Sequence, residues 1–262
     1  MDLGLKGKTA LLTGASRGLG MATAKTLARE GARVAINSRN PDHLAAAKDA
    51  LAEITSDIIT LPGDVSELET PERLVDQTLA AFGSLDLLFT NAGGPPPGAF
   101  EDIEEAIWQQ AIELSFMSHV RLIKAALPAL RQSETPSVLT VTSVSVKQPI
   151  PNLVLSNSIR AATAGLTKTL ALELGSDGIR FNSILPSWTQ TERVEQLLAD
   201  RASRKGTSVE DEIQAQNAQS PLGRMGTPQE FANAAVFLLS PAASYITGVM
   251  LTVDGGTYKG LI

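Results

Sequence analysis

The sequence predicts an α/β fold built on a doubly wound parallel sheet of seven strands, with helices on both faces. Short, nearly continuous apolar runs alternate with longer amphipathic segments along the 262 residues. This alternation is typical of parallel strands that are buried on both faces and joined by helices. No linker, shift in composition or internal repeat divides the chain, so we expect residues 1–262 to form one domain.

Seven strands and six helices are expected from these runs. The strands are expected at Thr9–Leu12, Arg33–Asn37, Ile58–Leu61, Leu85–Phe89, Val138–Thr142, Arg180–Ile184 and Val249–Val253. The helices are expected at about Leu19–Glu30, Asp42–Ile54, Pro71–Phe82, Ile103–Arg131, Leu153–Leu174 and Pro228–Leu239. The least regular segments are Gly93–Gly98, Lys147–Asn152 and Pro186–Pro221. Because open α/β sheets bind ligands beyond the carboxyl ends of their strands, these segments are candidate site loops.

The composition is that of a soluble globular protein and excludes several kinds of site. The net charge of −6 does not favour a nucleic-acid-binding surface. The chain has no cysteine, which excludes disulfides, thiolate metal sites and a cysteine nucleophile. His43 and His119 are far apart and have no ligand partners nearby in the sequence, so we expect no metal site. No leader-like segment and no membrane-spanning apolar run is evident, so we expect a cytoplasmic protein that does not enter membranes.

A glycine-rich turn, Thr13–Gly20, connects the first strand to the first helix. Glycines let the backbone turn sharply and approach a pyrophosphate closely, and the helix N-terminus adds free N–H groups. A strand, such a turn and a helix together predict a dinucleotide cradle of the Rossmann type. The candidate cofactor contacts in this turn are Gly14, Ser16, Arg17, Gly18, Leu19 and Gly20.

The end of the second strand indicates which dinucleotide binds. An acidic residue there would bind the ribose hydroxyls of NAD, whereas an arginine accommodates the 2′-phosphate of NADP. This chain has Ser38 and Arg39 at that place, and Arg17 adds a second cation in the glycine-rich turn. We therefore expect NADP(H), with NAD(H) as the less favoured cofactor. The alternative is that both arginines are solvated surface charges.

The chain resembles the short-chain dehydrogenases/reductases over nearly its whole length, and most closely their 3-oxoacyl-acyl-carrier-protein reductase branch. The resemblance depends on the order and spacing of several motifs. One of them departs from the family pattern, because Thr90 takes the place of the first asparagine in an NNAG motif. The matching residues are the TGxxxGxG turn Thr13–Gly20, Asp64 with Val65, Asn91-Ala92-Gly93, Asn182, Pro186, Thr191 and Val253-Asp254-Gly255-Gly256.

The resemblance implies hydride transfer between a nicotinamide and a carbonyl or alcohol, with a Ser, a Tyr, a Lys and an Asn at the catalytic centre. This chain keeps one of the four residue types. Ser143 takes the Ser position, and thirteen residues later Ser156 takes the Tyr position. Arg160 takes the Lys position and Ser115 the Asn position. By the same resemblance, Arg160, Pro186 and Thr191 also contact the cofactor.

These replacements predict an altered proton transfer. Unperturbed tyrosine has a pKa of about 10, and a serine hydroxyl is a far weaker acid. A positioned general acid typically contributes ~10²–10⁴ in rate, so its loss is severe. Lys147, four residues after Ser143, is a candidate replacement donor, with a solvated loop lysine as the alternative. Ser143 either orients the carbonyl or caps backbone groups at the strand end.

The loop after the sixth strand and the polar segment that follows resemble the family's substrate-binding region. Pro186–Thr191 is similar to the PGxxxT loop, with Ser187 in place of glycine. Trp188 either lines a substrate pocket or packs in the core. Residues 185–222 are expected to be a substrate lid within the single domain, and the alternative for the polar part, Arg193–Gln219, is a solvated helix face. The resemblance also implies a homotetramer or homodimer, formed through the helices at 103–131 and 153–174 and the C-terminal segment.

Two functions of different kinds follow from these features. The first is an NADP(H)-dependent oxidoreductase, similar to 3-oxoacyl-acyl-carrier-protein reductases, with an atypical proton-transfer set. The second is a catalytically inactive NADP(H)-binding sensor, scaffold or regulatory protein, which Ser156 and Arg160 favour. Another small ligand in the same cleft is a third, weaker alternative. The fold alone does not separate them.

Overall fold

A computed structural model describes residues 1–261 of the chain. The predicted strands form one fully parallel sheet in the order β3-β2-β1-β4-β5-β6-β7, which confirms the doubly wound fold. The order reverses between β1 and β4, the point at which such sheets open a ligand-binding crevice. The strands are β1 (Thr9–Leu12), β2 (Arg33–Ser38), β3 (Ile58–Pro62), β4 (Leu87–Thr90), β5 (Ser137–Val141), β6 (Arg180–Pro186) and β7 (Met250–Val253).

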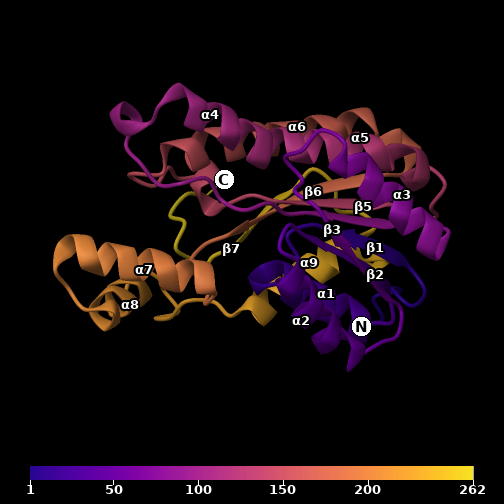
Figure 1. The fold of residues 1–262 in the computed structure, drawn as a ribbon, viewed down its shortest axis with the longest axis horizontal. Helices are drawn as coiled ribbons and strands as arrows, with labels where there is room; N and C mark the ends of the chain where they lie inside the picture. The colour runs from indigo at the N-terminus through magenta and orange to yellow at the C-terminus, as the bar shows by residue number, and fades with distance from the viewer. Residues whose placement is uncertain (262) are drawn as a thin grey trace.

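Helices cover both faces of the sheet (Figure 1). Helices α1, α2 and α9 pack on one face, around buried residues such as Leu27 and Phe231. Helices α3, α5 and α6 lie on the other face, around Leu74 and Phe181. The helices are α1 (Gly18–Arg29), α2 (Pro41–Ala52), α3 (Thr70–Phe82), α4 (Glu105–Ile112), α5 (Ser118–Leu130), α6 (Val154–Glu173), α7 (Glu192–Lys205), α8 (Val209–Asn217) and α9 (Pro228–Leu239).

The predicted long helix at 103–131 is continuous but irregular. It begins at Glu105, after a short 3₁₀ turn at Phe100–Asp102, and passes from α4 to α5 through a π-helical turn at Glu113–Met117. A π turn changes the hydrogen-bond spacing without a marked change in composition, so the apolar periodicity did not reveal it. Such turns occur frequently at functional sites.

The prediction that residues 186–221 are irregular was wrong, because most of this segment forms α7 and α8. Thr191 caps α7 by accepting a hydrogen bond from the amide of Val194, and Gly206 ends the helix at a φ of 68°. Ser208 and Asp211 form a capping box at the start of α8. The polar composition of α7 hid its helical periodicity. In Figure 1 the two helices project from the sheet-bearing body of the protein. No helix within residues 1–261 is long and apolar enough to cross a membrane.

Candidate active site

A cleft of about 590 Å³ lies at the carboxyl ends of the strands, next to the point where the strand order reverses. The loops after β1, β2, β3, β4, β5 and β6 all contribute to it. Its lining includes every predicted cofactor contact except Gly20, which is buried beneath the turn. Those lining residues are Gly14, Ser16, Arg17, Gly18, Leu19, Ser38, Arg39, Asp64, Val65, Asn91, Ala92, Gly93, Arg160, Pro186 and Thr191.

The glycine-rich turn fits a closely approaching dinucleotide. Gly14 and Gly18 have φ angles of 56° and 53°, which favour glycine. A Cβ atom on Gly20 would lie 2.4 Å from the carbonyl oxygen of Gly14, so this close packing of α1 against the turn requires glycine. The N-terminus of α1 follows at once, and Arg17 is its N-cap. Exposed amides at such an N-terminus suit a pyrophosphate.

Asn91 and Thr13 join the turn after β4 to the turn after β1. The hydroxyl of Thr13 donates to the carbonyl of Asn91 at 2.8 Å and accepts from the amide of Asn91 at 3.0 Å. The side-chain amide of Asn91 donates to the carbonyl of Gly14 at 3.1 Å. The predicted NAG motif therefore positions the backbone of the glycine-rich turn.

The end of β2 brings Arg39 beside Asp64. An Nη atom of Arg39 lies 3.8 Å from a carboxylate oxygen of Asp64, and both side chains line the cleft. Burial by itself raises the pKa of Asp64, but hydrogen bonds from Ser66 and the charge of Arg39 outweigh it and leave the pKa below its ordinary value. Arg39 is largely exposed, so its guanidinium is accessible to a ligand in the cleft.

Arg17 forms an ion pair that the sequence did not reveal. It pairs with Glu192, the first residue of α7, and both side chains line the cleft. Arg17 thus points to α7 and is paired rather than simply solvated. The two residues are 175 positions apart, so no local pattern could predict this contact.

Ser143, Ser156 and Arg160, the predicted Ser, Tyr and Lys positions, line the cleft together, as their register predicts. Arg160 donates two 3.1 Å hydrogen bonds, to the carbonyls of Val141 and Thr142 at the end of β5. These bonds hold the guanidinium at the strand end. The hydroxyl of Ser143 accepts a hydrogen bond from the amide of Ser145 at 3.1 Å, so Ser143 both caps the strand end and faces the cleft.

Arg193 is a second cation beside Arg160. A Cβ atom placed on Gly94 would lie 3.7 Å from an Nη of Arg160 and 4.0 Å from an Nη of Arg193, so the two guanidinium groups approach the same glycine. Burial, and then the charge of Arg193, lower the pKa of Arg160 to about 10. Arg193 forms no ion pair with an acidic side chain within residues 1–261. Sequence reasoning did not single out Arg193, because it lay in the segment assigned to a polar lid.

Ser115 lies behind the cleft and does not line it. It is buried in the π turn between α4 and α5, and its hydroxyl donates to the carbonyl of Gly93 at 3.4 Å. Nearby, the buried ring of His119 is 2.7 Å from the hydroxyl of Thr90, the residue that departs from the NNAG pattern. Burial, and then the charge of Arg160, lower the pKa of His119 to about 3, so this ring is neutral at ordinary pH.

Lys147, the candidate replacement donor, is not among the residues that line the cleft. Its Nζ lies 5.3 Å from the ring centroid of Tyr258, a cation–π contact. The structure therefore brings Ser143, Ser156 and Arg160 together at the cleft, and places Lys147 elsewhere.

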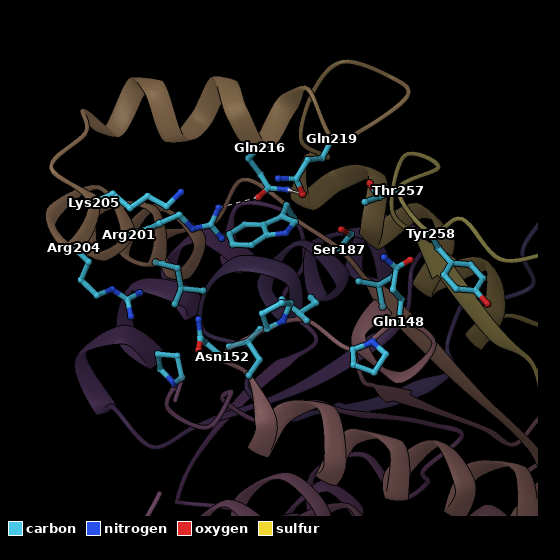
Figure 2. Close-up of a pocket in the computed structure, with 18 residues that line it drawn as sticks. Gln148, Asn152, Ser187, Arg201, Arg204, Lys205, Gln216, Gln219, Thr257 and Tyr258 are labelled. Atoms are coloured by element: carbon cyan, nitrogen blue, oxygen red, sulfur yellow. Dashed lines mark hydrogen bonds between the residues drawn. The ribbon is translucent and has the colours of Figure 1, made fainter. Parts of the chain in front are cut away.

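A second cavity, also of about 590 Å³, adjoins the cleft and shares Leu153, Ser187 and Leu197 with it. Figure 2 shows the side chains that line this second cavity. Trp188 lines this second cavity, and the guanidinium of Arg201 lies 4.7 Å from its ring centroid. Ser187 replaces the family's glycine without a left-handed backbone, since Asn152 is the one non-glycine residue of 1–261 with a positive φ. The second cavity thus lies where the resemblance predicts the substrate.

The fold and the cleft define a dinucleotide-binding α/β protein with polar side chains at the end of β5. A model of the enoyl-(acyl carrier protein) reductase family matches residues 14–258. An L-rhamnose 1-dehydrogenase (NAD(P)⁺) from Sphingomonas sp. is 34% identical over 261 residues, which cover 98% of each chain. The chain belongs to the short-chain dehydrogenase/reductase family, whose members are NAD(P)-dependent oxidoreductases.

Solved structures agree with this assignment. L-sorbose reductase from Gluconobacter frateurii, complexed with NADPH and L-sorbose, superposes with a TM-score of 0.95 at 31% identity over the full length of both chains. A short-chain oxidoreductase from Pseudomonas aeruginosa PAO1 that contains an atypical catalytic centre superposes with a TM-score of 0.90. It is 29% identical, and the match covers 98% of this chain and 99% of that one. The predicted family, fold and oxidoreductase class are confirmed.

Proposed function

We propose that this protein is an NADP(H)-dependent oxidoreductase that interconverts a carbonyl and an alcohol with an atypical proton-transfer set. One observation carries the proposal. A single cleft is lined both by the glycine-rich turn and by Ser143, Ser156 and Arg160. A dinucleotide held by the turn would extend along this cleft toward the two serines.

The proposed binding of NADP(H) is supported by the charges and the backbone geometry of the cleft. The amides at the N-terminus of α1 would bind the pyrophosphate, and Arg39 with Ser38 would bind the 2′-phosphate of NADP(H). The absence of an acidic residue at the end of β2 supports NADP(H) over NAD(H), and the NADPH complex of L-sorbose reductase agrees with it. When bound, the nicotinamide supplies or accepts the hydride.

At the reacting end, Ser143 and Ser156 would hold the substrate oxygen by hydrogen bonds, since both line the cleft. Arg160 would hold the cofactor ribose and keep positive charge beside the developing alkoxide, because its two bonds to β5 fix its place. A serine hydroxyl is a weak acid, so proton transfer is expected to limit the rate. Orientation beside the cofactor still contributes to catalysis.

The substrate is proposed only as a small carbonyl or alcohol compound. Two of the named relatives, L-rhamnose 1-dehydrogenase and L-sorbose reductase, act on sugars, whereas the sequence motifs resemble those of 3-oxoacyl-acyl-carrier-protein reductases. A homodimer or homotetramer is proposed from the family resemblance, and light scattering tests it. Leu172, which is 76% exposed on α6, lies on one of the expected contact helices.

A catalytically inactive NADP(H)-binding protein is the second candidate, and Ser156 and Arg160 in the Tyr and Lys positions favour it. One experiment separates the two functions. NADPH binding is measured beside turnover on a panel of sugars, ketones, alcohols and 3-oxoacyl thioesters. Turnover that saturates with substrate supports the oxidoreductase. Tight NADPH binding with no turnover across the panel would support the binding protein, and absence of NADPH binding would overturn both.

A further inference from the structure

The charges around the second cavity are all of one sign. Its charged lining residues are Arg201, Arg204 and Lys205, and no acidic side chain of residues 1–261 lines it. The chain as a whole carries a net charge of −6, so this clustering runs against the overall balance. All three cations come from the last two turns of α7, and Figure 2 shows the side chain of Arg201 directed toward Gln216, apart from that of Arg204.

One carboxylate, which does not itself line the cavity, neutralises part of this positive charge. Glu212 of α8, whose side chain is 4% exposed, lies 3.1 Å from Lys205 and 3.8 Å from Arg201. Burial by itself raises the pKa of Glu212, but hydrogen bonds from Thr207 and Lys205 keep it below its ordinary value. One carboxylate therefore pairs with two of the three cations, Arg204 has no ion pair within residues 1–261, and excess positive charge is left at the cavity.

Arg201 and Arg204 differ in how firmly they are held. Arg201 lies over the ring of Trp188, and its Nη1 donates to the side chain of Gln216 at 3.3 Å. Arg204 makes one hydrogen bond within residues 1–261, from Nε to the carbonyl of Asp200, so its terminal nitrogens are open to a ligand. A held and an open guanidinium, three residues apart on one helix, therefore line the same cavity, and we call this pair of side chains the fork.

The position of this fork sets the distance to the reacting end. Leu197 lines both cavities, and Arg201 and Arg204 follow it by four and seven residues on α7. A helix rises about 1.5 Å per residue, so the fork lies ~6–10 Å farther along the helix axis. A substrate that reaches from the serines to the fork therefore has several bonds between its carbonyl and its anionic group.

We propose that the substrate of this enzyme carries a carboxylate or phosphate several bonds from its reacting carbonyl, bound by Arg201 and Arg204. The inference rests on the proposed oxidoreductase function and adds the substrate class. The cations also suit the C-terminus of α7, where basic side chains meet the negative end of the helix dipole. The experiment must therefore separate ligand binding from helix stabilisation.

The test compares an acidic ketone with its neutral ester. The probes are 6-oxoheptanoate, its methyl ester and 5-oxohexylphosphonate, each assayed with NADPH and each also titrated by calorimetry without turnover. In the wild type, kcat/KM for the acid is expected to exceed that for the ester about tenfold, the scale of one charge-assisted pair. A higher kcat/KM for 5-oxohexylphosphonate than for 6-oxoheptanoate would indicate a phosphate site, and the reverse order would indicate a carboxylate site.

Variants assign the preference to the fork. Arg204→Met is expected to lower kcat/KM for the acid about tenfold and to leave the ester within about twofold, and Arg204→Glu reverses the preference. Arg29→Met is the matched control, because Arg29 is also a basic residue in the last turn of a helix but lies outside both cavities. Thermal unfolding of each variant reports any loss of helix stability.

The outcomes separate this inference from the function on which it rests. Efficient reduction of neutral ketones, with the acid no better than its ester, would overturn the acidic substrate and leave the oxidoreductase standing. Loss of NADPH binding and of all turnover would overturn the oxidoreductase. In that case, saturable binding of 6-oxoheptanoate to the wild type, abolished by Arg204→Glu, would still support the anion site. If 6-oxoheptanoate does not bind to the wild type, the anion site is rejected.

Discussion

The guanidinium of Arg17 lies 2.5 Å from the carboxylate of Glu192, and this ion pair joins the glycine-rich turn to the first turn of α7. Arg17 is the N-cap residue of α1, and Thr191, the N-cap of α7, lies against Gly18. The two helix N-termini therefore meet at the mouth of the cofactor cleft. A ligand at the turn would therefore lie close to the N-terminus of α7.

Replacement of Glu192 by Gln is expected to tighten NADPH binding about threefold, because it removes a negative charge from a cleft that receives an anionic cofactor. The pair is largely exposed, so the free energy of unfolding should change by less than about 1 kcal/mol. Fluorescence titration measures the dissociation constant. Glu195→Gln, on the same helix but outside the cleft lining, is the control. Weaker binding in the Glu192 variant would contradict this electrostatic account.

Replacement of Arg39 by Met is expected to weaken NADPH binding about tenfold and to leave NADH binding unchanged, because only NADPH carries the 2′-phosphate. The ratio of the two dissociation constants is the measurement. Arg17→Met provides the comparison, since Arg17 is already paired with Glu192. A larger loss of selectivity in Arg17→Met than in Arg39→Met would move the phosphate site to the glycine-rich turn.

The double replacement Ser156→Tyr with Arg160→Lys restores the family's residue types at the end of β5. We expect ketone reduction to rise about a hundredfold, within the usual range for a positioned general acid. Steady-state kcat on the most active ketone of the panel is the readout. Ser158→Tyr places a tyrosine on an exposed position of the same helix and serves as the control. No increase would mean that the surrounding cleft no longer supports tyrosine-dependent proton transfer.

Replacement of Lys147 by Ala is expected to leave kcat within about twofold, because Lys147 lies over Tyr258 and does not line the cleft. Loss of the cation–π contact should lower the free energy of unfolding by about 0.5–1 kcal/mol. Turnover and chemical denaturation are measured on the same preparation. A large loss of kcat with unchanged stability would restore Lys147 as the proton donor.

The buried ring of His119 is expected to make the protein sensitive to acid. Its pKa is about 3 in the folded protein and about 6.5 when unfolded, so the unfolded chain binds the extra proton between these values. Stability is therefore intact above pH 6.5 and falls with decreasing pH, by at most ~1.4 kcal/mol per pH unit from this group. Chemical denaturation from pH 7 to 4 measures the slope.

His119→Gln is the matched variant, since its amide can hydrogen-bond to Thr90 without titrating. The variant should show a shallower loss of stability below pH 6.5 than the wild type. Equal slopes in the wild type and His119→Gln would show that the ring does not stay neutral in the folded protein.

The sheet and the cofactor turn were readable from the sequence because their signals are local. Buried parallel strands appear as short apolar runs, and Thr13–Gly20 carries its glycines at fixed spacing. The register of α6 likewise predicts that Ser156 and Arg160 share a cleft with Ser143, and all three residues line it. Helices α7 and α8 were missed, although their caps at Thr191 and Ser208 were present, because charged residues obscured the apolar face.

The sequence by itself determined the family, the doubly wound sheet and the residue types at the cofactor turn and at the end of β5. Only the tertiary structure decided which charges meet. Arg17 forms an ion pair with Glu192, and the guanidinium groups of Arg160 and Arg193 both lie near Gly94. Arg201 and Arg204 line a second cavity. The physical reason is that strand and turn signals arise from neighbouring residues, whereas electrostatic pairing depends on how distant segments fold onto one another.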